Sequence, residues 1–386
     1  PVKRLISASD FSYAGSFAMP EQACGWTTAW STAGLALRRV NGMLHFFGGV
    51  HVYSGGLVYE VAYPGVSDAA GWPTATVTDQ RCDIYQGRKR TGADPEPLGD
   101  DLQTHGLMFD QDSQRLYWSF GQFYNGDHSN DNAIGYTSFD GTPTAYGPWS
   151  ATVHSQKVRG GTLLIPRGFA DAYLGGRRLG LGFGGYYNII GEGSMGPALF
   201  AVDAPGAEGP LDALALMDHP AGVSNADRWA LRPANYWIDG IDWAVSPVDG
   251  VGRWAPGDTV NGAAVWIDEP DVQGLLVAAQ LQTGRVWYAG GGLHADGDGG
   301  YWYIYDPAVL AEVAQGRRSP DSVQPTEITP VAYPTSGSFG SGDFTMAQRI
   351  SGMAYDSPTR TLFLLQLNAR SDGGEWTPLV HAYRLR

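Results

Sequence analysis

Residues 34–65 read GLALRRVNGMLHFFGGVHVYSGGLVYEVAYPG, and this stretch decides the fold. It contains three apolar runs, and a glycine opens the first of them. Asn41 and Gly42 separate the first two runs, and a glycine-rich loop separates the second from the third. Asn-Gly between runs of apolar residues is a strong signal for a tight hairpin. The stretch therefore predicts three consecutive antiparallel strands.

The same order of an opening glycine, two apolar strands, a polar glycine-rich loop and a third strand recurs along the chain. The further copies open at Gly106, Gly168, Gly262 and Gly352. Successive opening glycines are 62 to 94 residues apart, which leaves room for a fourth strand in each copy. A unit that recurs at such intervals is the signature of a repeat architecture.

Five copies of a four-stranded antiparallel unit predict an all-β fold, a β-propeller of five blades in a single domain, 1–386. Radial repetition leaves few long exposed sheet edges. The last copy stops after its third strand, and residues 11–20 (FSYAGSFAMP) supply the missing outer strand and close the ring. A sixth or seventh blade remains an alternative, with residues 225–260 as the sixth. The predicted blade cores are 34–87, 106–160, 168–224, 262–330, and 352–386 with 11–20.

Composition agrees with many short strands joined by tight turns. The 386 residues include 54 Gly, 24 Pro and 13 Trp. The net charge of −14 argues against a nucleic-acid partner, because phosphate binding needs clustered Lys and Arg. No apolar run reaches 18 residues, so no membrane span is expected. One short connecting helix is predicted over 307–316, which has Pro near its start and Gly at its end.

Two cysteines, Cys24 and Cys82, are too few for a disulfide framework or a thiolate zinc site, and whether they form one bridge stays open. The chain begins at Pro1 without Met, and we expect a mature, secreted or periplasmic monomer. The stretch 294–302 (HADGDGGYW) offers oxygen ligands for calcium but lacks the closing Glu of an EF-hand loop. No cofactor is expected to be required, and a structural Ca or Zn ion remains an alternative.

The positions before the opening glycines are the first candidates for a functional site. In propellers the first strand of each blade lines the central channel, and its entry end opens on the face where ligands bind. Packing alone would favour small or apolar side chains there, and His105, Arg167 and Arg349 break that expectation. The residues directly before the opening glycines are Ala33, His105, Arg167, Asn261 and Ser351. Gln103 and Arg349 lie two positions further back in their copies.

The loops between second and third strands should rise on the same face. Tyr and Trp rings stack on sugar rings, while amides and guanidinium groups bind hydroxyls and carboxylates. Together with the inner positions, these loops predict a polar-ligand site. The expected catalytic residues are His105, His128, Tyr124, Tyr187, Arg167 and Arg349. The expected substrate-binding residues are His51, Gln103, Asn125, Asn188, Glu192, Asn261, His294 and Asn368. Each of these residues has a purely structural role as its alternative. In that case His105 is a hydrogen-bonded residue of the channel, the arginines join neighbouring blades through ion pairs, and the tyrosines only pack.

Arg, His and Tyr together suit β-elimination from a uronic acid in a polysaccharide. The reaction needs a cation to neutralise the carboxylate, a base for the C5 proton and an acid for the leaving oxygen. We assign the carboxylate to Arg167 and Arg349, the base to His105 or His128, and the acid to Tyr124 or Tyr187.

Two stretches, THGLMF…FYNGDH from Thr104 to His128 and FFGGVH ending at His51, resemble the propeller-fold lyases that cleave ulvan and rhamnose–glucuronate bonds. The resemblance implies a His that opens an inner strand and a second His just beyond the next strand, with Tyr and Arg from later blades. Those lyases have seven blades, whereas five are predicted here.

Two other functions compete with the lyase. Five-bladed propellers are a common scaffold for glycoside hydrolases, which need two carboxylates about 5–10 Å apart. The candidates for such a pair are Asp100, Asp101, Asp171, Glu192, Asp239, Asp242 and Glu269. A non-catalytic glycan-binding propeller is the third possibility, although the polar residues differ from blade to blade and favour one asymmetric site.

Overall fold

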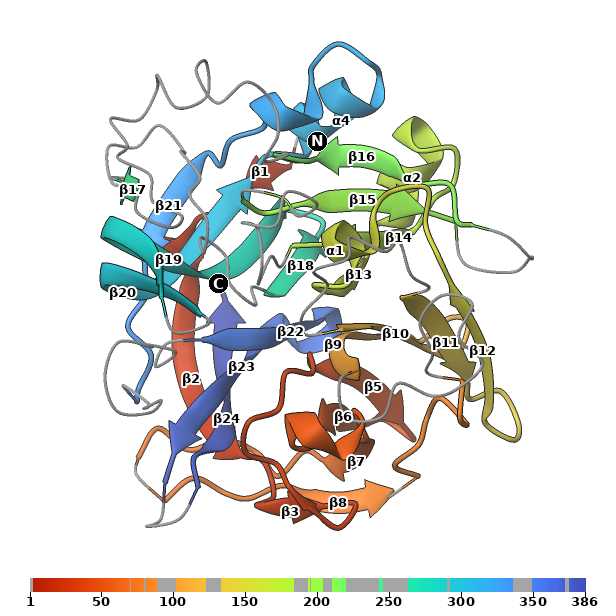
Figure 1. Ribbon diagram of the computed structural model, residues 1–386, viewed down its shortest axis with the longest axis vertical. Helices are drawn as coiled ribbons and strands as arrows, with labels where there is room; N and C mark the ends of the chain where they lie inside the picture. Colours follow the sequence, from red (N-terminus) through yellow and green to blue (C-terminus); the bar gives the residue numbers. More distant parts are fainter. Residues whose placement is uncertain are drawn as a thin grey trace.

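Five four-stranded antiparallel blades surround a common axis in the computed structural model (Figure 1). The predicted five-bladed propeller is confirmed. The structure describes residues 3–69, 71–79, 81–88, 102–122, 133–183, 194, 196–203, 210–219, 243–245, 263–289, 292–335, 349–371 and 375–386.

The blades are built in chain order, each from its inner to its outer strand. The first two are β5 (Ala36–Val40), β6 (Met43–Gly49), β7 (Val58–Ala62) and β8 (Thr76–Asp79), then β9 (Leu102–Asp110), β10 (Arg115–Gln122), β11 (Ile134–Ser138) and β12 (Thr144–Trp149). The third is β13 (Thr162–Leu164), β14 (Leu179–Gly182), β15 (Leu199–Val202) and β16 (Leu214–Met217). The last two are β18 (Ala263–Asp268), β19 (Val272–Ala289), β20 (Gly292–Tyr305) and β21 (Glu327–Pro330), then β22 (Ile350–Asp356), β23 (Thr361–Arg370), β24 (Thr377–Leu385) and β2 (Phe11–Ala18).

The turn that decides the first hairpin has the geometry its sequence predicts. Val40 pairs with Met43, so Asn41 and Gly42 form a two-residue loop. Their φ angles are 51° and 83°, the left-handed values that the twist of a two-residue hairpin requires.

The ring closes as predicted, through a strand from the N-terminal part of the chain. β2 pairs antiparallel with β24 from Phe11 opposite Leu385 to Ala18 opposite Leu379. A second N-terminal strand, β1 (Arg4–Leu5), pairs parallel with β19 of the fourth blade. The segment that precedes the first blade therefore contacts both of the last two.

The third copy departs from the sequence prediction. The stretch that begins at Arg167 and Gly168 is helix α2 (Arg167–Tyr173), and the inner strand β13 lies before it. Pro166 lacks an N–H and suits the start of a helix, while Gly175 and Gly176 with positive φ end it. The opening glycine of this blade is Gly161, not Gly168.

Two further helices and one short strand lie outside the four-stranded cores of the blades. The predicted helix over 307–316 is confirmed as α4 (Pro307–Ala314), whose N-terminus is capped by the Asp306 side chain. A four-residue helix, α1 (Ser155–Val158), precedes the third blade. Within 225–260, the alternative sixth blade, the structure describes β17 (Trp243–Val245), which pairs with β19 of the fourth blade.

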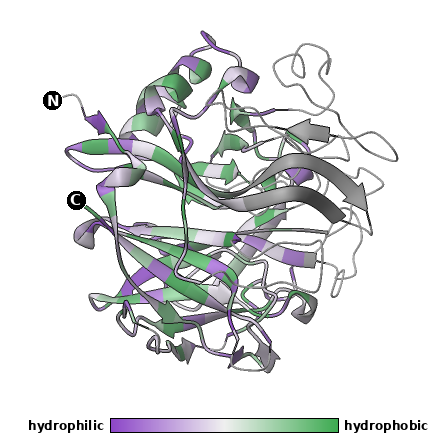
Figure 2. Ribbon diagram, turned by 90° about the vertical axis from the view of Figure 1, so that its left-hand side faces the viewer, coloured by the Kyte–Doolittle hydropathy of each residue, from purple (hydrophilic) through white to green (hydrophobic). Residues whose placement is uncertain are grey.

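Apolar side chains fill the space between every pair of neighbouring blades. Five clusters of buried residues each combine side chains from two adjacent blades. Phe46 of the first blade and Phe363 of the fifth, for example, meet edge to face with ring centroids 4.9 Å apart. Because both faces of a blade are covered, a strand such as β23 is buried along nearly its whole length. Figure 2 shows hydrophobic residues along many of the strands.

The inner strands approach one another so closely that only glycine fits at the contact points. A β-carbon on Gly352 would collide with the backbone of Gly34 and Leu35 in the next blade. One on Gly34 would lie 3.0 Å from the His105 carbonyl oxygen, and one on Gly106 would lie 2.8 Å from the Gly161 carbonyl carbon. The opening glycines of the repeats thus mark backbone-to-backbone contacts around the axis.

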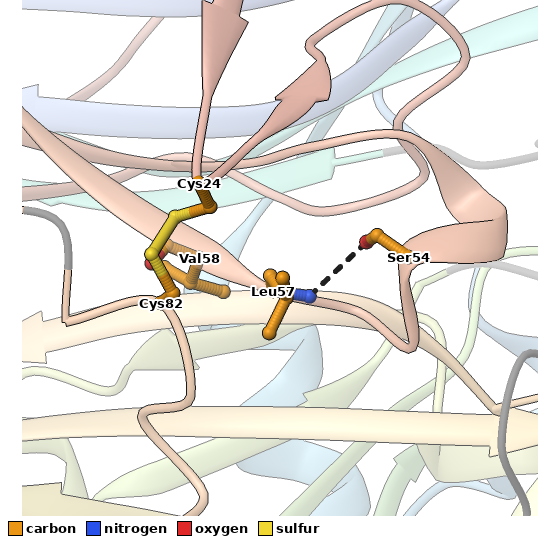
Figure 3. Close-up of a disulfide and its surroundings, with 5 residues drawn as sticks. All are labelled: Cys24, Ser54, Leu57, Val58 and Cys82. Carbon is orange, nitrogen blue, oxygen red and sulfur yellow. Dashed lines mark hydrogen bonds between the residues drawn. A yellow bond between two sulfur atoms is a disulfide. The ribbon is translucent and has the colours of Figure 1, made fainter.

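A disulfide joins Cys24 and Cys82, which settles the pairing that the sequence left open (Figure 3). Their Cα atoms are 5.7 Å apart, within the range that a disulfide spans. Cys24 lies at the tip of the hairpin formed by β3 (Gln22–Ala23) and β4 (Trp26–Thr27), and Cys82 follows β8. The bond fastens this hairpin to the outer strands of the first blade.

The fifth blade contains a chain of hydrogen-bonded polar side chains, of which Gln366, His381 and Ser16 are buried. His381 Nε2 is 2.7 Å from Gln366 Oε1, which can only accept, so Nε2 carries the proton. Its Nδ1 then accepts from the Ser16 hydroxyl at 2.6 Å, and Ser16 accepts from the Tyr13 hydroxyl at 2.7 Å. Burial lowers the pKa of His381 to about 3, so the imidazole is neutral at ordinary pH.

We expect Gly352→Ala to lower the free energy of unfolding by about 3 kcal/mol, because the new methyl group would force two inner strands apart. Gly168→Ala is the matched control, since its β-carbon would meet nothing within 4 Å. Urea unfolding of both variants measures the difference. Equal stability of the two variants would show that the inner strands can separate freely.

We expect the neutral His381 to make the fold acid-sensitive. The folded-state pKa of about 3 lies below the usual 6.5, so between these values the unfolded chain binds more protons. Stability from this residue is complete above pH 6.5 and falls by about 1.4 kcal/mol per pH unit as the pH drops. From pH 6.5 to 4.5 the loss should be about 3 kcal/mol smaller in His381→Gln. Identical losses in urea unfolding would contradict a neutral buried imidazole.

Candidate functional site

The candidate site lies where the chain enters the inner strands, an end that we call the entry face. Because the strands are antiparallel, each loop between a second and a third strand lies at this end too. The loop between β6 and β7 and the one between β23 and β24 are examples. The opposite end, which carries the turns between first and second strands, is called the exit face.

Bulges at the entry ends of two inner strands bring His105 and Ser351 to the axis. In the second blade, His105 and Gly106 together oppose the single residue Ser119. In the fifth blade, Ser351 is an extra residue between the pairs formed by Ile350 and Gly352. A bulge re-aims the side chains next to it, and here both bulges fall at the residue before an opening glycine.

Hydrogen bonds between blades fix these bulges. Ser351 Oγ donates to the Ala33 carbonyl at 2.9 Å, and Gly34 N–H donates to the His105 carbonyl at 2.5 Å. In the second blade, Ser119 Oγ accepts from Gly106 N–H at 2.8 Å and donates to the Arg159 carbonyl at 3.0 Å. Four blades are thereby tied together at the entry face.

Three buried side chains at this end belong to two arginines and one histidine. His105, Arg159 and Arg349 are 7%, 4% and 4% exposed, and they come from the second, third and fifth blades. His105 itself lines the central passage. Arg159 is next to Gly160 in the chain and Arg349 is two residues from Ser351, and both Gly160 and Ser351 line the passage. The two arginines and the histidine favour ligands that carry carboxylate, phosphate or many hydroxyls.

The passage between the inner strands is too narrow to hold such a ligand. At the glycines it has a volume of about 10 Å³, room for a water molecule at most. A ligand recognised by the basic side chains therefore binds on the entry face rather than inside the channel. Towards the exit face the channel widens to an apolar cavity of about 140 Å³.

Two amide side chains belong to the same region. Gln103 is buried and pairs with Gly121, against which the Arg159 side chain packs. Asn368 is 3% exposed and lies in an irregular part of β23, with φ of 48°. Within the described residues, its Oδ1 has no hydrogen-bond partner. A buried amide oxygen without a partner costs stability unless a ligand or water satisfies it.

The other predicted site residues fall into two groups. His51 is partly buried in the loop between β6 and β7, and its ring lies nearly parallel to that of Trp26. His294 lies opposite Trp287 in the ladder of β19 and β20, and only its backbone is described. Seven more lie outside the described residues: Tyr124, Asn125, His128, Tyr187, Asn188, Glu192 and Asn261.

Arg167 lies elsewhere than predicted. It begins α2 on the exit face, its side chain is 64% exposed, and it lies 3.7 Å from Asp112. Gly160 directly precedes the true opening glycine, Gly161, and the basic residue of this blade is Arg159, one position further back. The sequence signal for this was VRGGTLL (158–164), a glycine pair before a short apolar run, which a search for longer strands overlooks.

Two of the seven candidate carboxylates are described, and both lie away from the entry face. Glu269 follows β18 at the exit face, where it accepts a 2.9 Å hydrogen bond from the Tyr355 hydroxyl. Asp171 lies in α2 at the same end. Burial and the bond to Glu269 raise the pKa of Tyr355 far above its usual value. Asp100, Asp101, Glu192, Asp239 and Asp242 lie outside the described residues.

The described residues contain neither a cluster suited to a metal ion nor a membrane-spanning helix. No group of three or more His, Cys, Asp or Glu side chains is placed there to hold a metal ion. Nor is any helix there long and apolar enough to cross a membrane.

No protein-family model matches this sequence, and no curated protein matches it. Among solved structures, it is similar to one from the GH130 family of mannoside phosphorylases, described as containing glycoside hydrolases that target β-1,2-mannosidic linkages in Candida mannan. The identity is 11%, over 99% of this chain and 97% of that chain, with a TM-score of 0.39. It is also similar to an α-L-arabinofuranosidase from Podospora anserina, 12% identical over 96% of this chain and 97% of that chain, with a TM-score of 0.34.

A third similar structure is a GH43 β-1,3-galactosidase, 7% identical over 96% of this chain and 94% of that chain, with a TM-score of 0.35. At such identities and scores the roles of residues in those enzymes do not transfer to this chain.

We expect Asn368→Gly to be about as stable as the natural chain, because glycine adopts a φ of 48° without strain and removes a buried oxygen that lacks a partner. Asn368→Ala should be less stable than Asn368→Gly by about 1 kcal/mol, since its β-carbon disfavours that φ. Urea unfolding of both variants tests this. If glycine instead costs several kcal/mol, Asn368 is held for stability rather than for a ligand.

Proposed function

We propose that this protein is a carbohydrate-active enzyme that binds a polysaccharide or oligosaccharide with acidic groups on its entry face and cleaves a glycosidic bond there. The observation that carries the proposal is the burial of His105, Arg159 and Arg349 at one end of the channel. The chain as a whole has a net charge of −14, so burying His105, Arg159 and Arg349 at this end supports an anionic or oxygen-rich ligand.

Hydrolysis is the first candidate for the reaction. The propeller has five blades, a common number for hydrolase scaffolds, and the lyases that the sequence resembles have seven. A hydrolase needs a carboxylate pair. In this proposal the pair comes from Asp100, Asp101, Glu192, Asp239 and Asp242, because Asp171 and Glu269 lie at the exit face.

Elimination is the second candidate, and a specific observation favours it. The described residues that line the passage at the entry end include His105, Gly160 and Ser351 but no carboxylate. In this reaction Arg159 and Arg349 would neutralise the uronate carboxylate while His105 takes the C5 proton. The C4–O bond breaks, a C4–C5 double bond forms, and the leaving oxygen receives a proton from Tyr124 or Tyr187.

The Cys24–Cys82 bond supports a place outside the cytoplasm, where disulfides persist. We therefore keep the secreted or periplasmic location as part of the proposal. It is tested by whether the bond forms in protein isolated from its natural host.

The experiment incubates the protein with neutral and uronic-acid polysaccharides and follows reducing ends together with absorbance near 235 nm. New reducing ends without absorbance indicate hydrolysis, and both together indicate elimination. Arg159→Gln and Arg349→Gln should each lower kcat/KM at least about 100-fold, because each removes a buried charge-assisted contact.

Arg167→Ala is the matched control, because this arginine is exposed on the exit face, and its activity should stay within about twofold of the natural chain. Circular dichroism and urea unfolding confirm that each variant is folded. Equal losses in Arg159→Gln and Arg167→Ala would contradict the placement of the site. Glycan binding without any new end would reduce the proposal to a binding propeller.

A further inference from the structure

One aromatic side chain on the entry face is exposed in a way that packing does not explain. Trp118, Trp266 and Trp302 are 0%, 8% and 2% exposed, whereas Trp26 is 42% exposed. We infer that Trp26 is a stacking platform for one sugar ring of the glycan, held in position by the Cys24–Cys82 disulfide. This inference rests on the proposed function and adds a binding position at the rim of its site.

The local backbone fixes the direction of Trp26. Ala23 pairs with Trp26, so Cys24 and Gly25 form a two-residue hairpin loop. Their φ angles are 53° and 77°, which is the geometry of the tightest hairpins. Trp26 is thus the first residue after a rigid turn.

The loop between β6 and β7 packs against the Trp26 indole through His51. The rings of Trp26 and His51 lie nearly parallel, at 24°, with centroids 6.2 Å apart. His51 N–H donates to the Thr27 carbonyl at 2.9 Å, and Val52 N–H donates to the Trp30 carbonyl at 3.2 Å. The hairpin therefore lies along the loop between β6 and β7 on the entry face.

The disulfide anchors the tip of the same hairpin. Cys24 is bonded to Cys82, and its Sγ lies 3.9 Å from the Val58 carbonyl oxygen at the start of β7 (Figure 3). At the other end of the segment, Glu21 lies 3.5 Å from Arg370 of the fifth blade. Trp26 is held from both sides before any ligand arrives, and such preorganisation lowers the entropic cost of binding.

A flat, exposed indole that is fixed in place fits the apolar C–H face of a pyranose ring. Trp26 belongs to the hairpin over the first blade, whereas the basic groups lie at the axis. The sugar on Trp26 is therefore a different unit from the one whose bond is cleaved. Loss of this contact should weaken the binding of long oligosaccharides and leave the chemical step unchanged.

The test measures Kd by calorimetry with hexasaccharides of glucose, mannose and xylose and with an oligouronate of the same length. For whichever hexasaccharide the natural chain binds, Trp26→Ala should raise Kd about tenfold, the size expected for one lost stacking contact, with kcat within about twofold. Trp26→Tyr should restore most of the affinity. Tyr146→Ala is the control, because Tyr146 is 43% exposed on β12, an outer strand of the second blade.

Reduction of the disulfide gives an independent readout. Cys24→Ser should raise Kd about threefold in the natural background, by loosening the platform, and should have no further effect in Trp26→Ala. Unchanged affinity in Trp26→Ala, with the natural chain still binding its hexasaccharide, overturns the platform and leaves the proposed function standing. Absence of binding to every hexasaccharide by the natural chain overturns both.

Discussion

The backbone-to-backbone approach of the inner strands is the constraint on which the rest of the structure depends. Gly352 and Gly106 leave room for the neighbouring blade where any other residue would collide with it, and the contact at Gly34 is nearly as tight. This approach draws the five blades together so that their faces pack as apolar interfaces. It also closes the axis to all but the smallest molecules.

The same crowding explains how large polar side chains come to lie beside the axis. A regular strand cannot place a large side chain where two backbones touch, and a bulge supplies one extra residue just above that point. In the second blade this residue is His105, and in the fifth it is Ser351. Ser119 then bonds the bulge to Arg159 of the next blade, so the fold itself positions groups that would be costly to bury without support.

The sequence predicted the parts of the molecule that follow local rules. An opening glycine before an apolar run located β5, β9 and β22, and the missing outer strand of the last copy predicted the pairing of β2 with β24. It failed in the third blade, where β13 is three residues long and helix α2 imitates the expected pattern. For that reason Arg159 was missed and Arg167 chosen. The disulfide stayed undecided because its formation depends on the folded distance between residues 58 positions apart.

The pairing of β2 with β24 has a consequence for the order of events during synthesis. β2 leaves the ribosome before the other four blades, and its partner β24 leaves it after them. Until then, Phe17 and its neighbours lack the side chains of the fifth blade that cover them, and the strand presents an unpaired edge. Folding of the ring is therefore governed by one contact that spans nearly the whole chain, which makes late closure slow and the incomplete ring prone to association.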